Sequence, residues 1–140
     1  YHDRYGLPAA PSVPHTIPRP AGAIHEFPMP VCRKFGYPLP VGGGGYFRLY
    51  PYFLTRHGLR SLNRRGQPFV FYVHPWEVDP EQPRLPVSWG KKFRHYVGLK
   101  RTQPRLARLL ADFRFGTLSE AFAAAGMRGE LQTWELPAAA

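Results

Sequence analysis

Proline placement constrains the possible folds of this chain more than any other feature. Seven of its 17 prolines fall within the first thirty residues. Each proline removes a backbone hydrogen-bond donor and disfavours helix in the residue before it. The first forty residues are therefore predicted to run extended. Ala23 to Phe27 is the best strand candidate, and Pro28 and Pro30 after it indicate an edge position or a strand end.

A glycine run lies beside aromatic side chains in VGGGGYFRLYPY, Val41 to Tyr52. Flexible linkers are poor in apolar side chains, so this is not linker composition. Phosphate-binding glycine loops require a particular strand, turn and helix context, and one type also requires a lysine, so a phosphate site is weakly supported. The glycines instead predict a tight bend that lets backbone approach a neighbouring strand or a ligand, with Tyr46 and Arg48 aimed by the turn.

Two regular elements are expected after this bend. Tyr52 to Arg64 carries apolar residues on one broad face, with Pro51 before it and Gly66 as its C-terminal cap, which predicts a helix. Phe69 to Val73 is a continuous aromatic and β-branched run, typical of a central strand covered on both faces. The run ends at His74-Pro75.

Two short helices are predicted near the C-terminus. Pro104 opens an amphipathic helix over Arg105 to Phe113. Thr117 to Glu120 matches a capping box ahead of a helix over Ala121 to Ala125, ended by Gly126. Leu131 to Leu136 is a weak final strand.

The succession of glycine bend, helix, buried strand, loop and helix favours an α/β fold, in which helices cover the faces of each buried strand. One central strand cannot form a closed sheet. Either the remaining strands belong to an N-terminal part that precedes this chain, or the chain is a small α+β body whose sheet lies in the proline-rich leader.

Composition narrows the functional classes. The formal net charge of +10 makes a polyanion such as nucleic acid or an anionic membrane surface a legitimate first hypothesis, but the charges are dispersed and none of the usual nucleic-acid-binding signatures is present. Cys32 stands alone, and no apolar run approaches the roughly 20 residues of a membrane span. The chain starts at Tyr1 without a methionine or a signal peptide, so we expect a fragment or a processed product.

His74 is the first candidate for chemistry, because it lies at the C-terminal end of the predicted strand, where α/β folds place ligands. Trp76, Glu77 and Asp79 follow it. The set suits a proton-transfer pair, part of a metal site or a carbohydrate-contacting rim, and equally a histidine that only binds backbone. The histidine spacing predicts no self-contained metal site, and no serine or Cys32 lies in a nucleophile context.

Four stretches of the chain resemble the C-terminal portion of a polysaccharide deacetylase, of the subgroup with NodB homology and a C-terminal extension of unknown function that is associated with bacterial exopolysaccharide and exosortase loci. The resemblance covers Tyr1 to about Phe122. The stretches are HDRYG from His2, GGGGYFRLYPY from Gly42, FYVHPWEVDPEQPR from Phe71 and FRHY from Phe93.

The resemblance implies a deformed (β/α) barrel with a divalent metal, usually zinc, held by an Asp and two His, and a catalytic Asp base. These residues belong to motifs expected before Tyr1, so no cofactor is expected within this chain. The last family motif, Leu-x-x-His, matches Phe71 to His74 with Phe in place of Leu. Its histidine is expected to act as general acid and to line the acetate pocket. Tyr46, Arg48, Trp76 and Glu77 are expected to contact or support substrate, and an arginine that pairs with a core carboxylate is the alternative for Arg48.

We therefore expect residues 1–90 to complete the deacetylase barrel, residues 91–136 to form a helical extension, and residues 137–140 to form a tail. The expected function is the C-terminal portion of a bacterial, cytoplasmic enzyme that removes N-acetyl groups from an exopolysaccharide and is inactive without its N-terminal metal-binding half. Its expected partners are that half and the polysaccharide, with no nucleic acid and no membrane span. The alternative is a non-catalytic module that binds carbohydrate or a polyanion.

Overall fold

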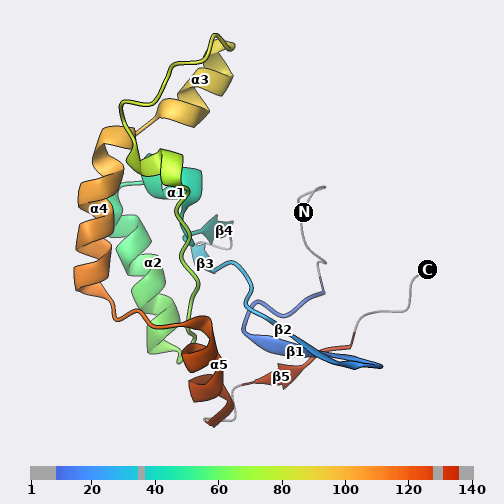
Figure 1. The fold of residues 1–140 in the computed structure, drawn as a ribbon. Coiled ribbons are helices and arrows are strands. Elements are labelled where there is room, and N and C mark those ends of the chain that lie inside the picture. The colour runs from blue at the N-terminus through green and yellow to red at the C-terminus, as the bar shows by residue number, and fades with distance from the viewer. Residues whose placement is uncertain (1–8, 35–36, 128–130, 136–140) are drawn as a thin grey trace.

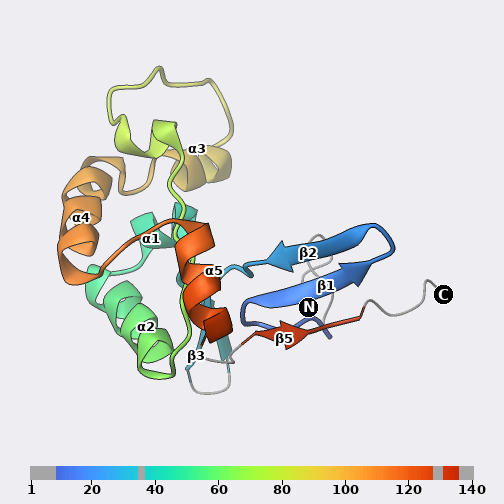
Figure 2. The same ribbon diagram turned by 60° about the horizontal axis from the view of Figure 1, so that its bottom comes forward.

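A computed structural model describes residues 9–34, 37–127 and 131–135 of the chain. Helices form one side of the described part, and two small sheets lie on the other (Figures 1 and 2). The elements in chain order are β1 (His15–Arg19), β2 (Gly22–Glu26), β3 (Val31–Lys34), β4 (Tyr37–Pro40), α1 (Gly44–Leu49), α2 (Tyr52–Arg64), the 3-10 helix η1 (Pro75–Val78), α3 (Trp89–Tyr96), α4 (Leu99–Asp112), α5 (Leu118–Met127) and β5 (Gln132–Thr133).

The described part of the proline-rich leader contains four strands. β1 and β2 form an antiparallel hairpin in which Ile17 faces Ile24, and β5 adds to the other side of β1 in parallel, with His15 opposite Gln132. β3 and β4 form a separate antiparallel pair. The predicted strand at Ala23 to Phe27 is thus confirmed as β2, at a sheet edge. Its position agrees with the prolines that follow, because an edge strand tolerates a missing donor.

α2 begins and ends where the sequence predicts. At its end, Gly66 N donates to Asn63 O at 3.0 Å and Gln67 N donates to Leu62 O at 3.1 Å. This is the Schellman pattern, which requires a left-handed residue after the helix. Gly66 supplies it with φ +72°.

The predicted central strand at Phe69 to Val73 is wrong for the described part of the chain. The segment is extended, but among the described residues only Tyr72 forms a β-bridge, a parallel one to Gly43. Phe69 and Phe71 are half-buried and pack on the helical core. A continuous apolar run shows that a segment is covered, but it does not show whether side chains or a paired strand cover it.

The C-terminal helices differ in extent from the prediction. α4 begins at Leu99, six residues before the predicted Arg105, and contains Pro104 within it. Pro104 has no N–H to donate to the Lys100 carbonyl. Lys100 is exposed, so water can hydrate that carbonyl instead. The predicted capping box of α5 is confirmed: Thr117 N donates to Glu120 Oε2 at 2.8 Å, and Glu120 N donates to Thr117 Oγ1 at 3.2 Å. α3 was not predicted.

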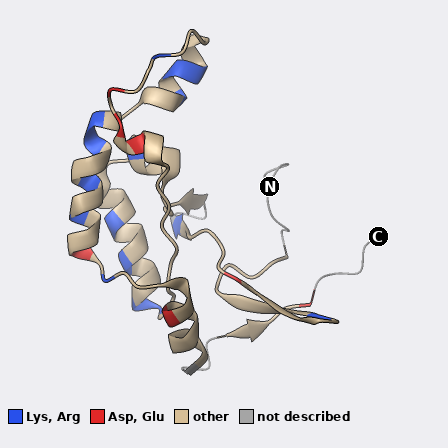
Figure 3. Cartoon of the chain, viewed as in Figure 1, with Lys and Arg blue, Asp and Glu red and all other residues tan. Residues whose placement is uncertain are grey.

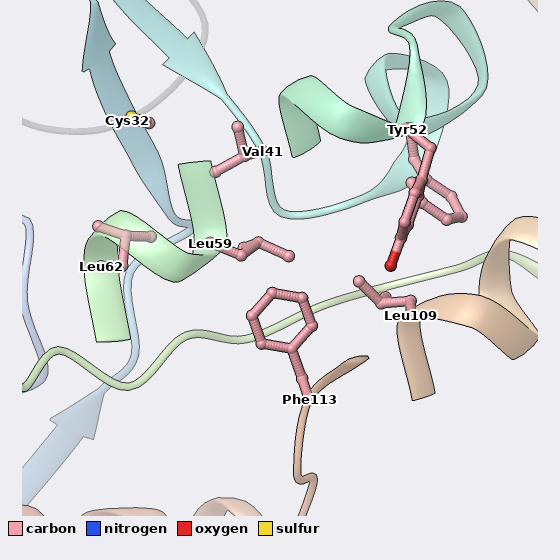
Figure 4. Close-up of a cluster of buried hydrophobic side chains, with 8 residues drawn as sticks. Cys32, Val41, Tyr52, Leu59, Leu62, Leu109 and Phe113 are labelled. Atoms are coloured by element: carbon pink, nitrogen blue, oxygen red, sulfur yellow. The ribbon is translucent and has the colours of Figure 1, made fainter. Parts of the chain in front are cut away.

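The hydrophobic core lies between α2, α4 and β3 (Figure 4). Phe69 and Phe71 reach it from the extended segment, with Phe71 edge-on to Phe47 and Phe69 edge-on to Phe113. The buried cluster comprises Cys32, Val41, Phe47, Tyr52, Leu59, Leu62, Leu109 and Phe113. The core therefore joins the leader, the glycine bend, α2 and α4.

The described residues form a mixed α/β arrangement without a closed barrel. The α4 helix packs against η1, α1 and α2, so it touches elements on the other side of the predicted boundary at residue 90. The barrel and that division stay predictions, and the tail at 137–140 lies outside the described residues. Within the described ranges, no helix combines the length and apolar character needed to cross a membrane.

Candidate functional site

The glycine bend brings α1 against the segment that carries His74. Tyr72 N donates to Gly42 O at 2.9 Å, and Gly44 N donates to Tyr72 O at 3.2 Å. A Cβ atom on Gly43 would overlap the Tyr72 carbonyl, and one on Gly44 would overlap the Tyr72 ring. Both glycines also have positive φ, +121° and +58°. The bend is thus a close approach of backbone to backbone, as the sequence predicts.

Arg48, four residues into α1, is buried and pairs with Glu77 of η1. Its Nε donates to Glu77 Oε1 at 2.8 Å, and the two side chains are 3% and 1% exposed. The rest of its guanidinium is used on the end of α3: Nη1 donates to the carbonyls of His95 at 2.8 Å and Val97 at 3.0 Å, and Nη2 donates to that of Arg94 at 3.2 Å. One arginine therefore ties α1, η1 and α3 together.

Glu77 also holds His74. The His74 backbone N–H donates to Glu77 Oε2 at 2.9 Å, and the Glu77 N–H donates to the His74 carbonyl at 2.9 Å. Both carboxylate oxygens of Glu77 thus have partners, one in the arginine and one in the histidine backbone. His74 is left at the start of η1 with its side chain exposed. Its backbone is fixed while its imidazole is accessible.

The His74 ring belongs to an aromatic stack. It lies parallel to Trp76, with ring centroids 5.8 Å apart, and Trp76 stacks on His95 at 4.3 Å. The Arg48 guanidinium lies 4.8 Å from the Trp76 ring centre. Gln82 fixes the stack, since its Nε2 donates to the Trp76 carbonyl at 2.7 Å and its Oε1 lies 3.1 Å from His95 Nε2. Trp76 is therefore already packed among protein groups.

An apolar hollow lies next to this stack. We call it the aromatic hollow; its volume is about 310 Å³. Tyr46, Leu49 and Phe93 in its wall are each about half exposed. Tyr72 also lines it, and the Tyr72 ring contacts His74 with centroids 5.4 Å apart. The lining residues are Gly45, Tyr46, Leu49, Tyr72, Phe93, Arg94 and Val97.

The structure brings the five predicted site residues into one region but gives them different environments. His74 and Tyr46 are exposed beside the hollow, and Trp76 is half-buried in the stack. Arg48 and Glu77 are buried and bonded to protein groups, which is the alternative predicted for Arg48. Direct substrate contact by these two stays a prediction, and their burial favours a positioning role.

Sequence reasoning gave no role to two residues of the stack, His95 and Gln82. His95 lies in the FRHY stretch, which enters the sequence analysis only through the family resemblance. Gln82 lies in the loop after η1. Their positions depend on α3 folding back over η1, and no local pattern in the sequence indicates that. The FRHY stretch is the one signal that could have pointed to His95.

Within the part of the chain that the structure describes, no group of three or more His, Cys, Asp or Glu side chains could hold a metal ion. Asp79, the carboxylate nearest to His74 in sequence after Glu77, is exposed and accepts from Glu81 N at 3.0 Å. The described residues therefore supply no ligand set of their own for the metal that the family resemblance implies, which is expected to be held by residues before Tyr1. What these residues offer is the imidazole of His74 and its neighbours.

A family model described as "Domain of unknown function (DUF3473)" matches residues 1–123. The match includes the glycine bend, His74, Trp76 and the stack on α3. Neither the curated proteins nor the solved structures gave a match.

Proposed function

The chain belongs to the DUF3473 family, and we propose that it is the C-terminal portion of a metal-dependent polysaccharide deacetylase, in which His74 is the general acid. The enzyme hydrolyses the amide bond of N-acetylated sugar units. The metal and the catalytic base belong to an N-terminal half, and this chain supplies a proton donor and a wall of the substrate groove.

The observation that carries the proposal is that His74 has a restrained backbone and an exposed ring. Its backbone is held by Glu77, while its ring is exposed and contacts a wall of the aromatic hollow. A histidine that served only the fold would be expected to be buried, whereas the His74 ring is exposed although one side of it contacts Tyr72 and Trp76. A fixed backbone with an accessible imidazole suits a residue that transfers protons, because proton transfer requires a defined position within reach of substrate.

The roles of the other residues follow from their contacts. Arg48 and Glu77 position His74 through the buried ion pair. Trp76 sets the plane of the imidazole by stacking. Tyr46 is half exposed in the wall of the hollow and can contact a sugar ring through its face or its hydroxyl group. In this proposal, His74 donates a proton to the nitrogen atom that leaves as the acetyl group is transferred to water.

Replacement of His74 by alanine in the complete enzyme tests the proposal. Loss of a positioned acid or base lowers the rate by about 10²- to 10⁴-fold. We expect a fall in kcat for acetate release of that size, with zinc content unchanged because the metal ligands lie elsewhere. His57→Ala is the matched control, since His57 is an exposed histidine on α2. Wild-type turnover in His74→Ala, or an equal loss in both variants, would contradict the assignment.

A further inference from the structure

One stretch of the chain carries most of its net positive charge. Residues 82–111 contain no Asp or Glu and eight basic residues. These are Arg84, Lys91, Lys92, Arg94, Lys100, Arg101, Arg105 and Arg108. The stretch forms α3, most of α4 and the loop that leads to α3. Figure 3 shows the basic residues along α3 and α4.

The same stretch exposes large apolar side chains. Trp89, at the first position of α3, is 78% exposed, and Phe93, one turn later, is 47% exposed. Leu85 and Val87 in the preceding loop are also exposed. We call these four residues the α3 patch. α3 lies at one end of the described part of the chain (Figure 1), and Trp89 stacks on Phe93 with ring centroids 5.7 Å apart.

The loop and the helix hold each other in place. Tyr96 of α3 accepts a hydrogen bond from Leu85 N at 2.8 Å and donates to the Pro83 carbonyl at 3.3 Å. The Arg84 guanidinium covers the Tyr96 ring at 4.1 Å. The α3 patch is thus preformed, which lowers the entropy lost when a partner binds.

We propose that the α3 patch and its lysines bind the surface of an anionic lipid bilayer. Exposed tryptophan and phenylalanine insert at the boundary between headgroups and acyl chains, where amphipathic rings are favoured. Lys91 and Lys92 follow Trp89 within one turn of α3, and their long side chains bring positive charge to the headgroups. The absence of carboxylates over residues 82–111 removes the repulsion that an anionic surface would otherwise meet.

The combination of features favours a bilayer over a soluble polyanion. A soluble polyanion is bound through charge and through stacking of rings along a groove. Here the exposed apolar residues include the aliphatic Leu85 and Val87, and the helix α3 that follows them lies at one end of the ribbon (Figure 1). The contact is peripheral, since one short helix with a few basic residues gives reversible binding. This inference does not depend on the catalytic role of His74.

Sedimentation of the chain with phosphatidylcholine vesicles, with and without phosphatidylglycerol, tests the proposal. We expect binding to the vesicles that contain phosphatidylglycerol and little to the neutral ones. Binding should fall steeply between about 0.1 M and about 1 M salt, because the screening length shrinks from roughly 10 Å to roughly 3 Å. The tryptophan emission should shift to the blue on binding, and the shift should be lost in Trp89→Phe while binding is retained.

Two variants separate the apolar and the charged contributions. Lys91→Gln/Lys92→Gln should weaken binding about 30-fold, since each cation near the surface contributes about 1 kcal/mol. Trp89→Ala should weaken it about 10-fold or more. Arg19→Gln/Arg33→Gln removes the same charge from exposed strand positions and should change binding little. All three variants alter exposed side chains, and an unchanged unfolding midpoint verifies that each is folded.

Three results would overturn the proposal. The first is equal binding to neutral and anionic vesicles, or none to either. The second is binding that the lysine and tryptophan variants leave unchanged. The third is tighter binding to a soluble polyanion such as an oligonucleotide, or self-association that Trp89→Ala abolishes, because the α3 patch would then serve another partner.

Discussion

At the scale of single residues, Arg48 and Glu77 decide how the site is held. The sequence predicts an arginine fork that faces a carboxylate, of the protein or of a ligand. The structure identifies the carboxylate as Glu77, 29 positions later in the chain and 1% exposed. The sequence could not supply this pairing, because it arises where α1 and η1 meet, and neither element reveals its neighbour through its own pattern.

Replacement of Glu77 by glutamine should destabilise the protein by about 3 kcal/mol, since it leaves the buried Arg48 guanidinium without its counter-charge. Urea unfolding measures the loss. The control is Arg56→Gln, because Arg56 pairs with Asp112 at 3.0 Å but the two side chains are 36% and 18% exposed. That variant should lose less than about 1 kcal/mol. Equal losses in the two variants would contradict the importance given to the buried pair.

Gly43 is the second residue with a specific structural requirement. Gly43→Ala should destabilise the protein by more than about 1 kcal/mol, because it combines a strained φ with overlap on the Tyr72 carbonyl. Gly90 on α3 is the matched control: a Cβ there meets nothing within 4 Å, so Gly90→Ala should be neutral or slightly stabilising. Thermal unfolding compares them. A Gly43→Ala protein as stable as the wild type would show that the close approach is dispensable.

At the scale of elements, helices were predicted better than strands. α2 and the capping box of α5 follow from local signals, a proline or a hydroxyl residue at the start and a glycine after the end. The early start of α4 was missed because Pro104 was interpreted as a first-turn residue, whereas it lies inside the helix. The Phe69 to Val73 segment was misassigned because its burial comes from aromatic packing on α1 and α4.

The contact between α2 and α4 includes a hydrogen bond between two titratable side chains, Tyr52 and Asp112. Tyr52 donates to Asp112 Oδ2 at 2.7 Å. Burial and this hydrogen bond raise the pKa of Tyr52 from 10.0 to about 12, and the hydrogen bond from Tyr52, with Arg56 nearby, lowers the pKa of Asp112. The contribution of Tyr52 to the free energy of unfolding is therefore complete below pH 10 and is lost as the pH rises from 10 to 12. The contribution of Asp112 to the free energy of unfolding is complete above 3.8, the pKa of this carboxyl in the unfolded chain. It is lost as the pH falls below that value.

Tyr52→Phe should consequently be less stable than the wild type at neutral pH by about 1 kcal/mol, the net value of one hydrogen bond. The difference in unfolding free energy should shrink toward both pH extremes. Urea titrations at acid, neutral and alkaline pH measure it, with Tyr37→Phe as the control because Tyr37 is 74% exposed. A difference that is independent of pH would contradict the link between α2 and α4.

At the scale of the whole molecule, the described residues carry most of their strands in the proline-rich leader and their helices beyond it, while a barrel completed by an N-terminal part stays a prediction. Long-range pairing such as β5 beside β1 joins residues over a hundred positions apart. Local periodicity contains no information on such pairs. The part of the site around His74 is predicted from the position of this histidine after an apolar run. The part of the site that lies on α3 depends on the tertiary fold.

The central claim is that His74 is the proton donor of a deacetylase. The most direct test is the pH dependence of kcat/KM for acetate release by the complete enzyme, with wild type compared with His74→Asn. The descending limb at high pH reports the essential acid of the free enzyme. We predict that the wild type shows this limb and that His74→Asn loses it together with most of its activity. A limb of the same position and height in both proteins would contradict the claim.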